Sequence, residues 1–146
     1  MVSLQETIRL GHSSRPSGQT LLVRRTVRSG QRIDYHGNVV IMGDVNPGGE
    51  VVAGGHVIVM GALKGIVHAG AEGDEGAVVI AFDLQPTQLR IAGYIARPPD
   101  GGDKPLKQPE IARVQEGTVI IERYQPGGER RYLNPGNFAK EEEQDG

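Results

Sequence analysis

The chain has 146 residues and a formal net charge of −2, which is enough for one domain with a buried core. This near-neutral charge argues against a nucleic-acid partner, and the lack of cysteine excludes disulfides, cysteine-bound zinc and thiol catalysis. No apolar run approaches the roughly 18 residues of a membrane helix, and the first 18 residues are too polar for a signal peptide. We therefore expect a cytoplasmic protein without direct membrane insertion.

Taken in chain order, residues 1–21 form a polar lead-in or linker, and residues 22–124 form the predicted domain. Within that domain Gln88–Ala96 is interpreted as a strand, Arg97–Pro109 as a proline-rich surface loop, and Ile111–Tyr124 as a return to strand. Residues 125–146 carry few residues to bury and are expected to be a flexible acidic tail.

The composition of the domain favours short strands joined by tight turns. Glycine makes up 22 of 146 residues, about 15% against a usual share of about 7%. Aromatic residues are only 4%, but Val and Ile occur in dense runs. Disorder would remove these β-branched residues as well, so the pattern indicates an all-β fold.

An internal repeat sharpens this prediction. Glycine, one variable residue and then a short run dominated by Val and Ile recur at Gly37–Ile41, Gly55–Val59, Gly76–Ile80 and Gly117–Ile121. The first two words are 18 residues apart, and the same step relates Gly30 to Gly48, Ile33 to Val51, Gly43 to Gly61 and Val45 to Leu63. A step of about 18 residues suits one coil of a β-solenoid, with three short strands per coil and a shared aliphatic interior.

The polar residues do not form a recognisable catalytic or metal-binding pattern. The histidines lack metal-ligand spacing beside a carboxylate; they are His12, His36, His56 and His68. Arg32 lies 18 residues before Glu50, so we expect these two side chains to pair across adjacent coils. We expect no enzyme activity, cofactor or metal.

The strands are apolar at both alternating positions, although a solenoid strand has only one inward face. If Val39, Ile41, Val57, Val59, Val78 and Ile80 fill the interior, an exposed stripe remains, formed by Val40, Met42, Ile58, Met60, Val79 and Ala81. Such a stripe predicts a partner surface, and we assign it to a homodimer. In the alternative interpretation, the proline-rich loop or the tail covers this face.

A basic cluster is the second candidate surface. It consists of Arg24, Arg25, Arg28 and Arg32, within nine residues of an otherwise neutral body. Arginine provides planar, bidentate donors, which suit recognition of a carboxylate or carbonyl group. A solvated strand edge is the alternative interpretation.

Several segments together resemble the C-terminal domain of the MinC family of bacterial septum-site-determining proteins. They are Val27–Ile33, Val40–Val51, Gly55–Gly61, Leu63–Gly65 and His68–Ala71, within a resemblance that covers Leu22–Tyr124. The resemblance implies a right-handed β-helix of triangular cross-section that forms a homodimer. It further implies binding to ATP-bound MinD at the membrane and inhibition of septum assembly through FtsZ, with recruitment to the inner membrane surface.

In this family the Arg-Ser-Gly-Gln segment belongs to the MinD-binding surface, which here implies Arg28, Ser29, Gly30 and Gln31. Gly48 is expected to stack one coil above Gly30 and to border the same surface. Two departures stand out: the family's N-terminal FtsZ-inhibiting domain is missing from these residues, and Ile66 replaces an arginine found in some relatives.

Two alternatives belong to other classes of protein. A self-assembling structural β-solenoid of the bactofilin kind would also stack aliphatic coils. A left-handed hexapeptide acyltransferase is disfavoured, because it needs strict six-residue repeats and a catalytic histidine.

Overall fold

The computed structural model describes residues 18–96 and 107–125. Within these ranges the chain forms eleven strands and no helix. The described residues therefore include no helix long and apolar enough to cross a membrane. The strands are β1 (Thr20–Val23), β2 (Arg32–Tyr35), β3 (Asn38–Ile41), β4 (Glu50–Ala53), β5 (Val57–Leu63), β6 (Ile66–Ala69), β7 (Val79–Leu84), β8 (Gln88–Ile91), β9 (Tyr94–Ile95), β10 (Glu110–Gln115) and β11 (Thr118–Arg123).

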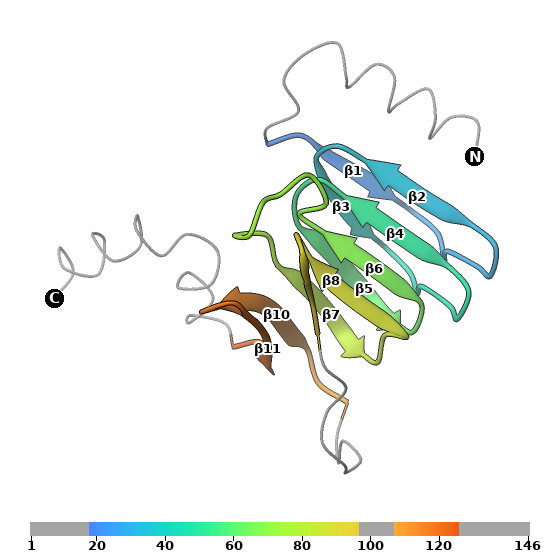
Figure 1. The fold of residues 1–146 in the computed structure, drawn as a ribbon. Coiled ribbons are helices and arrows are strands. Elements are labelled where there is room, and N and C mark those ends of the chain that lie inside the picture. The colour runs from blue at the N-terminus through green and yellow to red at the C-terminus, as the bar shows by residue number, and fades with distance from the viewer. Residues whose placement is uncertain (1–17, 97–106, 126–146) are drawn as a thin grey trace, which may run out of the picture.

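The predicted β-solenoid is confirmed. Strands β1, β3, β5 and β7 pair in parallel on one side, and β2, β4, β6 and β8 pair in parallel on another (Figure 1). A third, narrower side consists of the parallel bridges from Val27 to Val45 and from Val45 to Leu63. Each coil therefore contributes to three sides, which gives the stack its triangular section.

The predicted register is confirmed over the first three coils of the first side. Thr20 pairs with Asn38, and Val39 pairs with Val57, so each residue lies beside the one 18 positions later. On the second side Ile33 pairs with Val51, as the repeat predicted. Regular stacking explains why the repeat is visible in the sequence.

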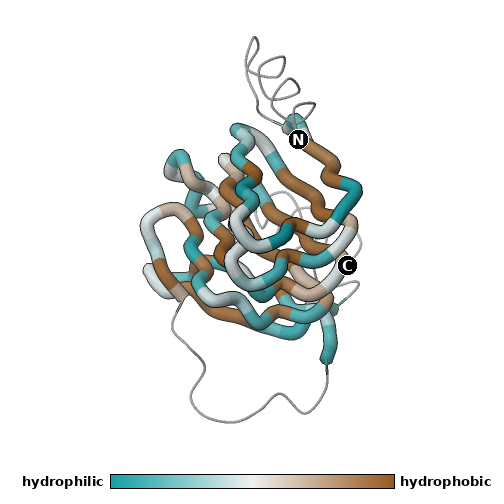
Figure 2. The backbone as a smooth tube through the Cα atoms, turned by 90° about the vertical axis from the view of Figure 1, so that its right-hand side faces the viewer, coloured by the Kyte–Doolittle hydropathy of each residue, from teal (hydrophilic) through white to brown (hydrophobic). Residues whose placement is uncertain are grey.

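Alternation within each strand builds the interior. In β3 and β4 every second residue is buried, and Figure 2 shows hydrophobic and hydrophilic segments alternating along the coils. The inward column along the first side includes Val39, Val57 and Val79, all fully buried. Burying one such side chain stabilises the fold by roughly 1.5–3 kcal/mol relative to exposure.

The fourth coil departs from the predicted phase. Val57 pairs with Val79, a step of 22 residues, so Val79 and Ala81 point inward and are fully buried. Their assignment to the exposed stripe is therefore wrong, and Val78 and Ile80 take the outward positions. The cause is the loop between β6 and β7. Gly76 lies in this loop, where its amide donates a hydrogen bond to the Asp74 carboxylate at 2.9 Å. Gly76 is therefore a loop residue and does not mark a corner of the solenoid.

The fourth glycine word, at Gly117–Ile121, is not a further coil. Strands β10 and β11 form an antiparallel hairpin, and β10 also pairs antiparallel with β7. Ile111 of β10 points outward and joins Val78 and Ile80 in a small second core, against which Ile58 and Tyr124 pack. This hairpin covers the end of the first side in Figure 1.

The strand predictions for the end of the domain are confirmed. Gln88–Ala96 contains β8 and the short antiparallel β9, and Ile111–Tyr124 contains most of the β10–β11 hairpin. The predicted lead-in up to residue 17, most of the proline-rich loop (97–106) and the tail from residue 126 lie outside the described residues.

Candidate partner-binding surfaces

Two stacked turns, Arg28–Gln31 and Asn46–Gly49, connect the third side of the solenoid to the second; we call them the turn ridge. In the first turn the Gln31 amide donates to the Arg28 carbonyl at 2.9 Å, and in the second Gly49 donates to Asn46 at 2.8 Å. Each turn has a glycine with positive φ at its third position, Gly30 at 85° and Gly48 at 87°. Glycine is favoured there because it adopts positive φ without steric cost.

The two turns are bonded to each other. The Gly30 amide donates to the Gly48 carbonyl at 2.9 Å, which confirms the predicted stacking of these residues. The third coil has a shorter corner, because Ile66 pairs with Glu50 only 16 positions earlier. The turn ridge is therefore confined to the first two coils.

The glycines of the ridge have different surroundings. A Cβ added to Gly30 would meet no heavy atom within 4 Å, so the space beside this residue is open. A Cβ added to Gly48 would collide with the Ser29 side chain, including its Cβ at 3.0 Å. Gly30 therefore leaves room for an approaching molecule, whereas Gly48 is needed for packing within the ridge.

The side chains of the first turn divide into exposed and internal groups. Arg28 and Ser29 are exposed, and within the described chain the Arg28 guanidinium has no ion-pair partner. Gln31 is half-buried, and its Oε1 accepts hydrogen bonds from the Arg28 amide at 2.8 Å and from Arg25 Nη1 at 3.0 Å. Sequence reasoning missed this role of Arg25, because side-chain bonding of this kind leaves no periodic signal.

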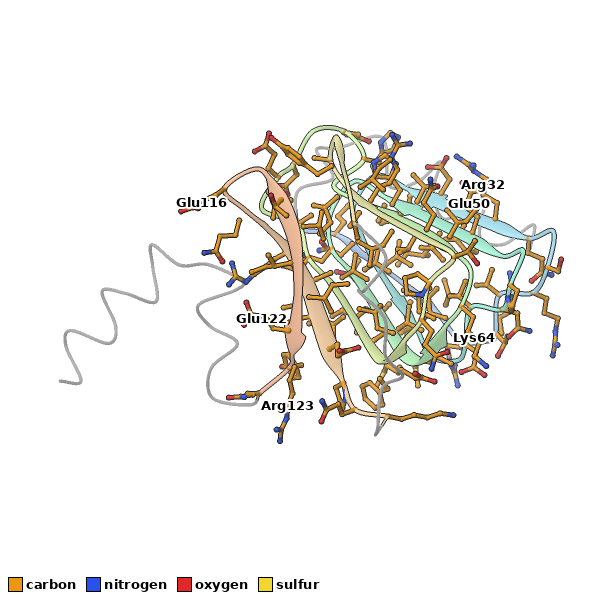
Figure 3. All side chains as sticks on the ribbon, turned by 60° about the horizontal axis from the view of Figure 1, so that its bottom comes forward. Arg32, Glu50, Lys64, Glu116, Glu122 and Arg123 are labelled. Carbon is orange, nitrogen blue, oxygen red and sulfur yellow. The ribbon has the colours of Figure 1, made fainter. Side chains whose placement is uncertain are left out.

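The basic cluster is not one uniform patch. Arg32 Nη1 lies 2.9 Å from Glu50, which confirms the predicted pair, and Figure 3 shows both side chains together. Arg32 also contacts Asp34 at 3.3 Å, and the hydrogen bond to Asp34 is the main cause that raises the pKa of Arg32. Arg24 and Arg28 remain exposed, so they are the arginines of the cluster most open to a partner.

The outer face of the first side carries an exposed apolar surface, which we call the apolar stripe. Four of its side chains are about half exposed, namely Leu22 (50%), Met42 (48%), Met60 (47%) and Phe82 (48%). Val40 and Ile58 are half-buried between them. Leu22 and Phe82 were missed, although Leu22 precedes Val40 by the repeat step; Phe82 was hidden by the altered phase of the fourth coil.

The proline-rich loop and the tail, which the alternative interpretation placed over this face, lie mostly outside the described residues. Among the described residues, the hairpin region packs against one end of this face. Ile80 is 7% exposed because Ile111 and Tyr124 pack there. Over β1, β3 and β5 the stripe is open in the described chain.

The three described histidines, His36, His56 and His68, each have a different partner, and His12 lies outside the described residues. His36 Nδ1 lies 2.5 Å from Glu72, and His68 Nε2 lies 2.8 Å from the Ala92 carbonyl oxygen. His56 Nδ1 accepts the Val78 amide at 3.0 Å, and burial lowers the pKa of His56 against an opposing effect of Asp74. In the described ranges no three His, Asp or Glu side chains gather as metal ligands.

Comparison with protein families gives a match over most of the chain. The family model described as septum formation inhibitor MinC, C-terminal domain, matches residues 21–124. A probable septum site-determining protein MinC from Heliobacterium modesticaldum is 60% identical over 109 residues, which are 75% of this chain and 38% of that protein. The corresponding protein from Acetivibrio thermocellus is 59% identical over 110 residues, 75% of this chain and 48% of the relative. The chain thus spans less than half the length of these two relatives.

A solved structure has the same fold. A chain in the MinC:MinD cell division protein complex from Aquifex aeolicus is 35% identical and superposes with a TM-score of 0.67. The similarity covers 82% of this chain and 98% of that chain.

Proposed function

This chain belongs to the family of MinC C-terminal domains, and on that premise we propose that it is a non-enzymatic adaptor that binds the ATPase MinD in division-site selection. The observation that carries the proposal is the similarity to a chain of the solved MinC:MinD complex, at 35% identity over nearly the whole of that chain. The family's description as a septum formation inhibitor supports the same role.

We assign the MinD-binding site to the turn ridge. Arg28 and Ser29 are exposed there, Gly30 borders open space, and Gly48 holds the ridge together by its close packing against Ser29. An arginine without an ion-pair partner in the described chain is suited to a forked, charge-assisted contact with a carboxylate or carbonyl of the partner. Gln31 lies in the same turn.

We assign homodimerisation to the apolar stripe. Of the residues expected there, Val40, Met42, Ile58 and Met60 lie on the outer face, and Leu22 and Phe82 extend it. Stripes of exposed apolar side chains of this kind are typical of interfaces with another protein chain. A dimer would present two turn ridges to membrane-bound MinD.

Recruitment by ATP-bound MinD would bring a cytoplasmic chain to the inner membrane surface, where the complex would antagonise FtsZ. Ile66 is half-buried on the outer face of β6, where it contributes no charge. We therefore propose that this domain targets inhibition and that FtsZ inhibition itself depends on residues beyond this domain.

The experiment that tests the MinD site is co-sedimentation with ATP-loaded MinD on vesicles containing anionic phospholipids. Arg28→Ala should weaken binding by about thirtyfold, because removing a well-packed interface arginine typically costs about 2 kcal/mol or more. Gly30→Asp should abolish co-sedimentation of this chain with MinD, since the new side chain would occupy the open space beside the turn.

The matched control is Arg123→Ala, which removes an exposed arginine from the hairpin at the far end of the stack (Figure 3). This variant should bind as well as the unaltered chain. Normal binding by folded Arg28→Ala and Gly30→Asp chains would refute the assignment.

A self-assembling structural solenoid of the bactofilin kind is not supported. The family match is to a septum formation inhibitor, and the antiparallel β9 and the β10–β11 hairpin end the parallel stacking after the fourth coil. Light scattering should therefore show no particles larger than the proposed dimer as the concentration is raised.

A further inference from the structure

The Gln31 side chain is bonded inside the turn ridge. Its Oε1 accepts the Arg28 amide at 2.8 Å, while the Gln31 amide donates back to the Arg28 carbonyl at 2.9 Å. Residues 28 and 31 are thus joined twice, once through the main chain and once through the side chain. The acceptor atom of Gln31 is therefore engaged before any partner arrives.

Arg25 completes this arrangement from outside the turn. Its Nη1 donates to Gln31 Oε1 at 3.0 Å and to the Thr26 carbonyl at 3.1 Å. The guanidinium is half-buried and connects the segment that follows β1 to the turn. Gln31 Oε1 thus accepts hydrogen bonds from both the Arg28 amide and the charged guanidinium of Arg25.

The second turn of the ridge shows why the first needs such support. In Asn46–Gly49 the second residue is Pro47, whose ring fixes φ near the value that this kind of turn requires. The first turn has Ser29 at that place, which leaves the chain freer in solution. It also belongs to the first coil, so within the described chain it has a bonded neighbour turn on one side only, at Gly48.

We propose that Arg25 and Gln31 are positioning residues that hold the Arg28–Gln31 turn in its binding conformation, and that neither touches the partner. This inference rests on the proposed MinD site. It changes the expected role of Gln31 from a partner contact to an internal support, and it adds Arg25 to the residues on which recognition depends.

The decisive comparison is between Gln31→Glu and Gln31→Ala in the full chain. Glutamate keeps an acceptor oxygen for the Arg28 amide and for Arg25 but loses the side-chain NH2, whereas alanine loses both. Two quantities are measured: hydrogen exchange of the residue 28 amide, and affinity for ATP-loaded MinD on anionic vesicles.

We expect Gln31→Ala to expose the residue 28 amide to exchange and to weaken MinD binding by about tenfold, the loss that follows from a hydrogen bond with a charged partner. Gln31→Glu should retain slow exchange and bind within about threefold of the unaltered chain. Arg25→Ala should weaken binding by less than Gln31→Ala, because Gln31 Oε1 still accepts the Arg28 amide in that variant. With Gln31 already replaced by alanine, the further change Arg25→Ala should add little to the loss of MinD binding, because the bond between the two side chains is already absent.

Gln88→Ala serves as the matched control, since it removes an exposed glutamine from β8 in the last coil. Two results would overturn the inference: slow exchange in Gln31→Ala, or loss of binding in Gln31→Glu while its residue 28 amide stays protected. The exchange measurement needs no partner, so it stands even if Arg28→Ala shows that the proposed MinD site is wrong.

Discussion

At the scale of single residues, Gly30 and Gly48 have nearly the same backbone conformation for different reasons. Both have φ close to 85°, a region in which a side chain costs about 1 kcal/mol. Only Gly48 also faces a neighbour, because Ser29 occupies the place that its Cβ would take. The sequence shows two glycines 18 residues apart, but it does not reveal which one is packed.

Replacing each glycine by alanine should separate these effects. Gly30→Ala should lower the free energy of unfolding by about 1 kcal/mol, from backbone strain alone. Gly48→Ala should lower it by more, because strain and the collision with Ser29 add. Urea unfolding of both variants tests this expectation.

The control for packing is the double variant Ser29→Gly with Gly48→Ala. Measured against Ser29→Gly alone, the Gly48→Ala change should lower the free energy of unfolding by less than it does in the unaltered chain, because the Ser29 side chain is no longer there to collide. Equal losses for the two single variants would contradict the difference in surroundings.

Residue exposure in the first turn could be predicted from the family resemblance, but the bonds of Gln31 could not. A solenoid repeat reports main-chain register, since residues one coil apart share an environment. The bond between Arg25 and Gln31 lies within one coil, spans six residues and has no counterpart in the next. Only coordinates reveal such a local contact.

At the scale of strands, the sequence predicts the first three coils and then slips by one residue. Aligning glycine words placed Gly76 against Gly55, a step of 21, whereas the strands pair with a step of 22. In a strand one residue of slip exchanges the two faces, which is why Val79 and Ala81 were assigned outward. The hydrophobicity around the start of β7 gives no warning, because Val78, just before the strand, and Val79 and Ile80 within it are all apolar and all buried.

Polar side chains at one corner fasten successive strands to each other. Asn38 Nδ2 donates to Thr20 at 3.2 Å, and Asn38 Oδ1 accepts the His56 amide at 2.9 Å. His56 Nδ1 then accepts the Val78 amide at 3.0 Å, at the start of β7. Because the ring nitrogen must be unprotonated to accept, this rung between coils three and four depends on pH.

Acidification should therefore weaken the fold through His56. Burial lowers the pKa of His56 in the folded chain below its ordinary value of 6.5, with Asp74 opposing. Below pH 6.5 the unfolded chain takes up this proton first, so the free energy of unfolding falls as pH decreases towards the lowered pKa. Above about pH 6.5 the contribution of His56 is fully present. Urea unfolding at a series of pH values measures the trend.

His56→Asn is the matched variant, because asparagine at position 38 already performs the same acceptor role one coil earlier. The difference in unfolding free energy between the unaltered chain and this variant should depend on pH only below about 6.5. A difference that is constant with pH would exclude His56 as the titrating group.

At the scale of the whole molecule, the two ends of the solenoid are unlike. Beyond the fourth coil the hairpin and β9 replace parallel pairing, and Ile111 and Tyr124 close over Ile80. Growth by parallel stacking is thereby stopped at that end, so association through the side is favoured. Among the described residues, the apolar stripe holds four of the six large hydrophobic side chains that are exposed, namely Leu22, Met42, Met60 and Phe82.

We expect the apolar stripe to be the dimer interface. Met42→Asp combined with Met60→Asp should give folded monomers. Both methionines are about half exposed in the single chain, so a dimer would bury their remaining apolar surface. Full burial of such a side chain contributes roughly 1.5–3 kcal/mol before association costs, and aspartate removes this contribution. Sedimentation velocity across a concentration series measures the oligomeric state. Ile95→Asp is the control, since Ile95 is 51% exposed but lies on β9, beside the second side. Dimers that persist in the methionine variant, or monomers produced by Ile95→Asp, would move the interface away from the stripe.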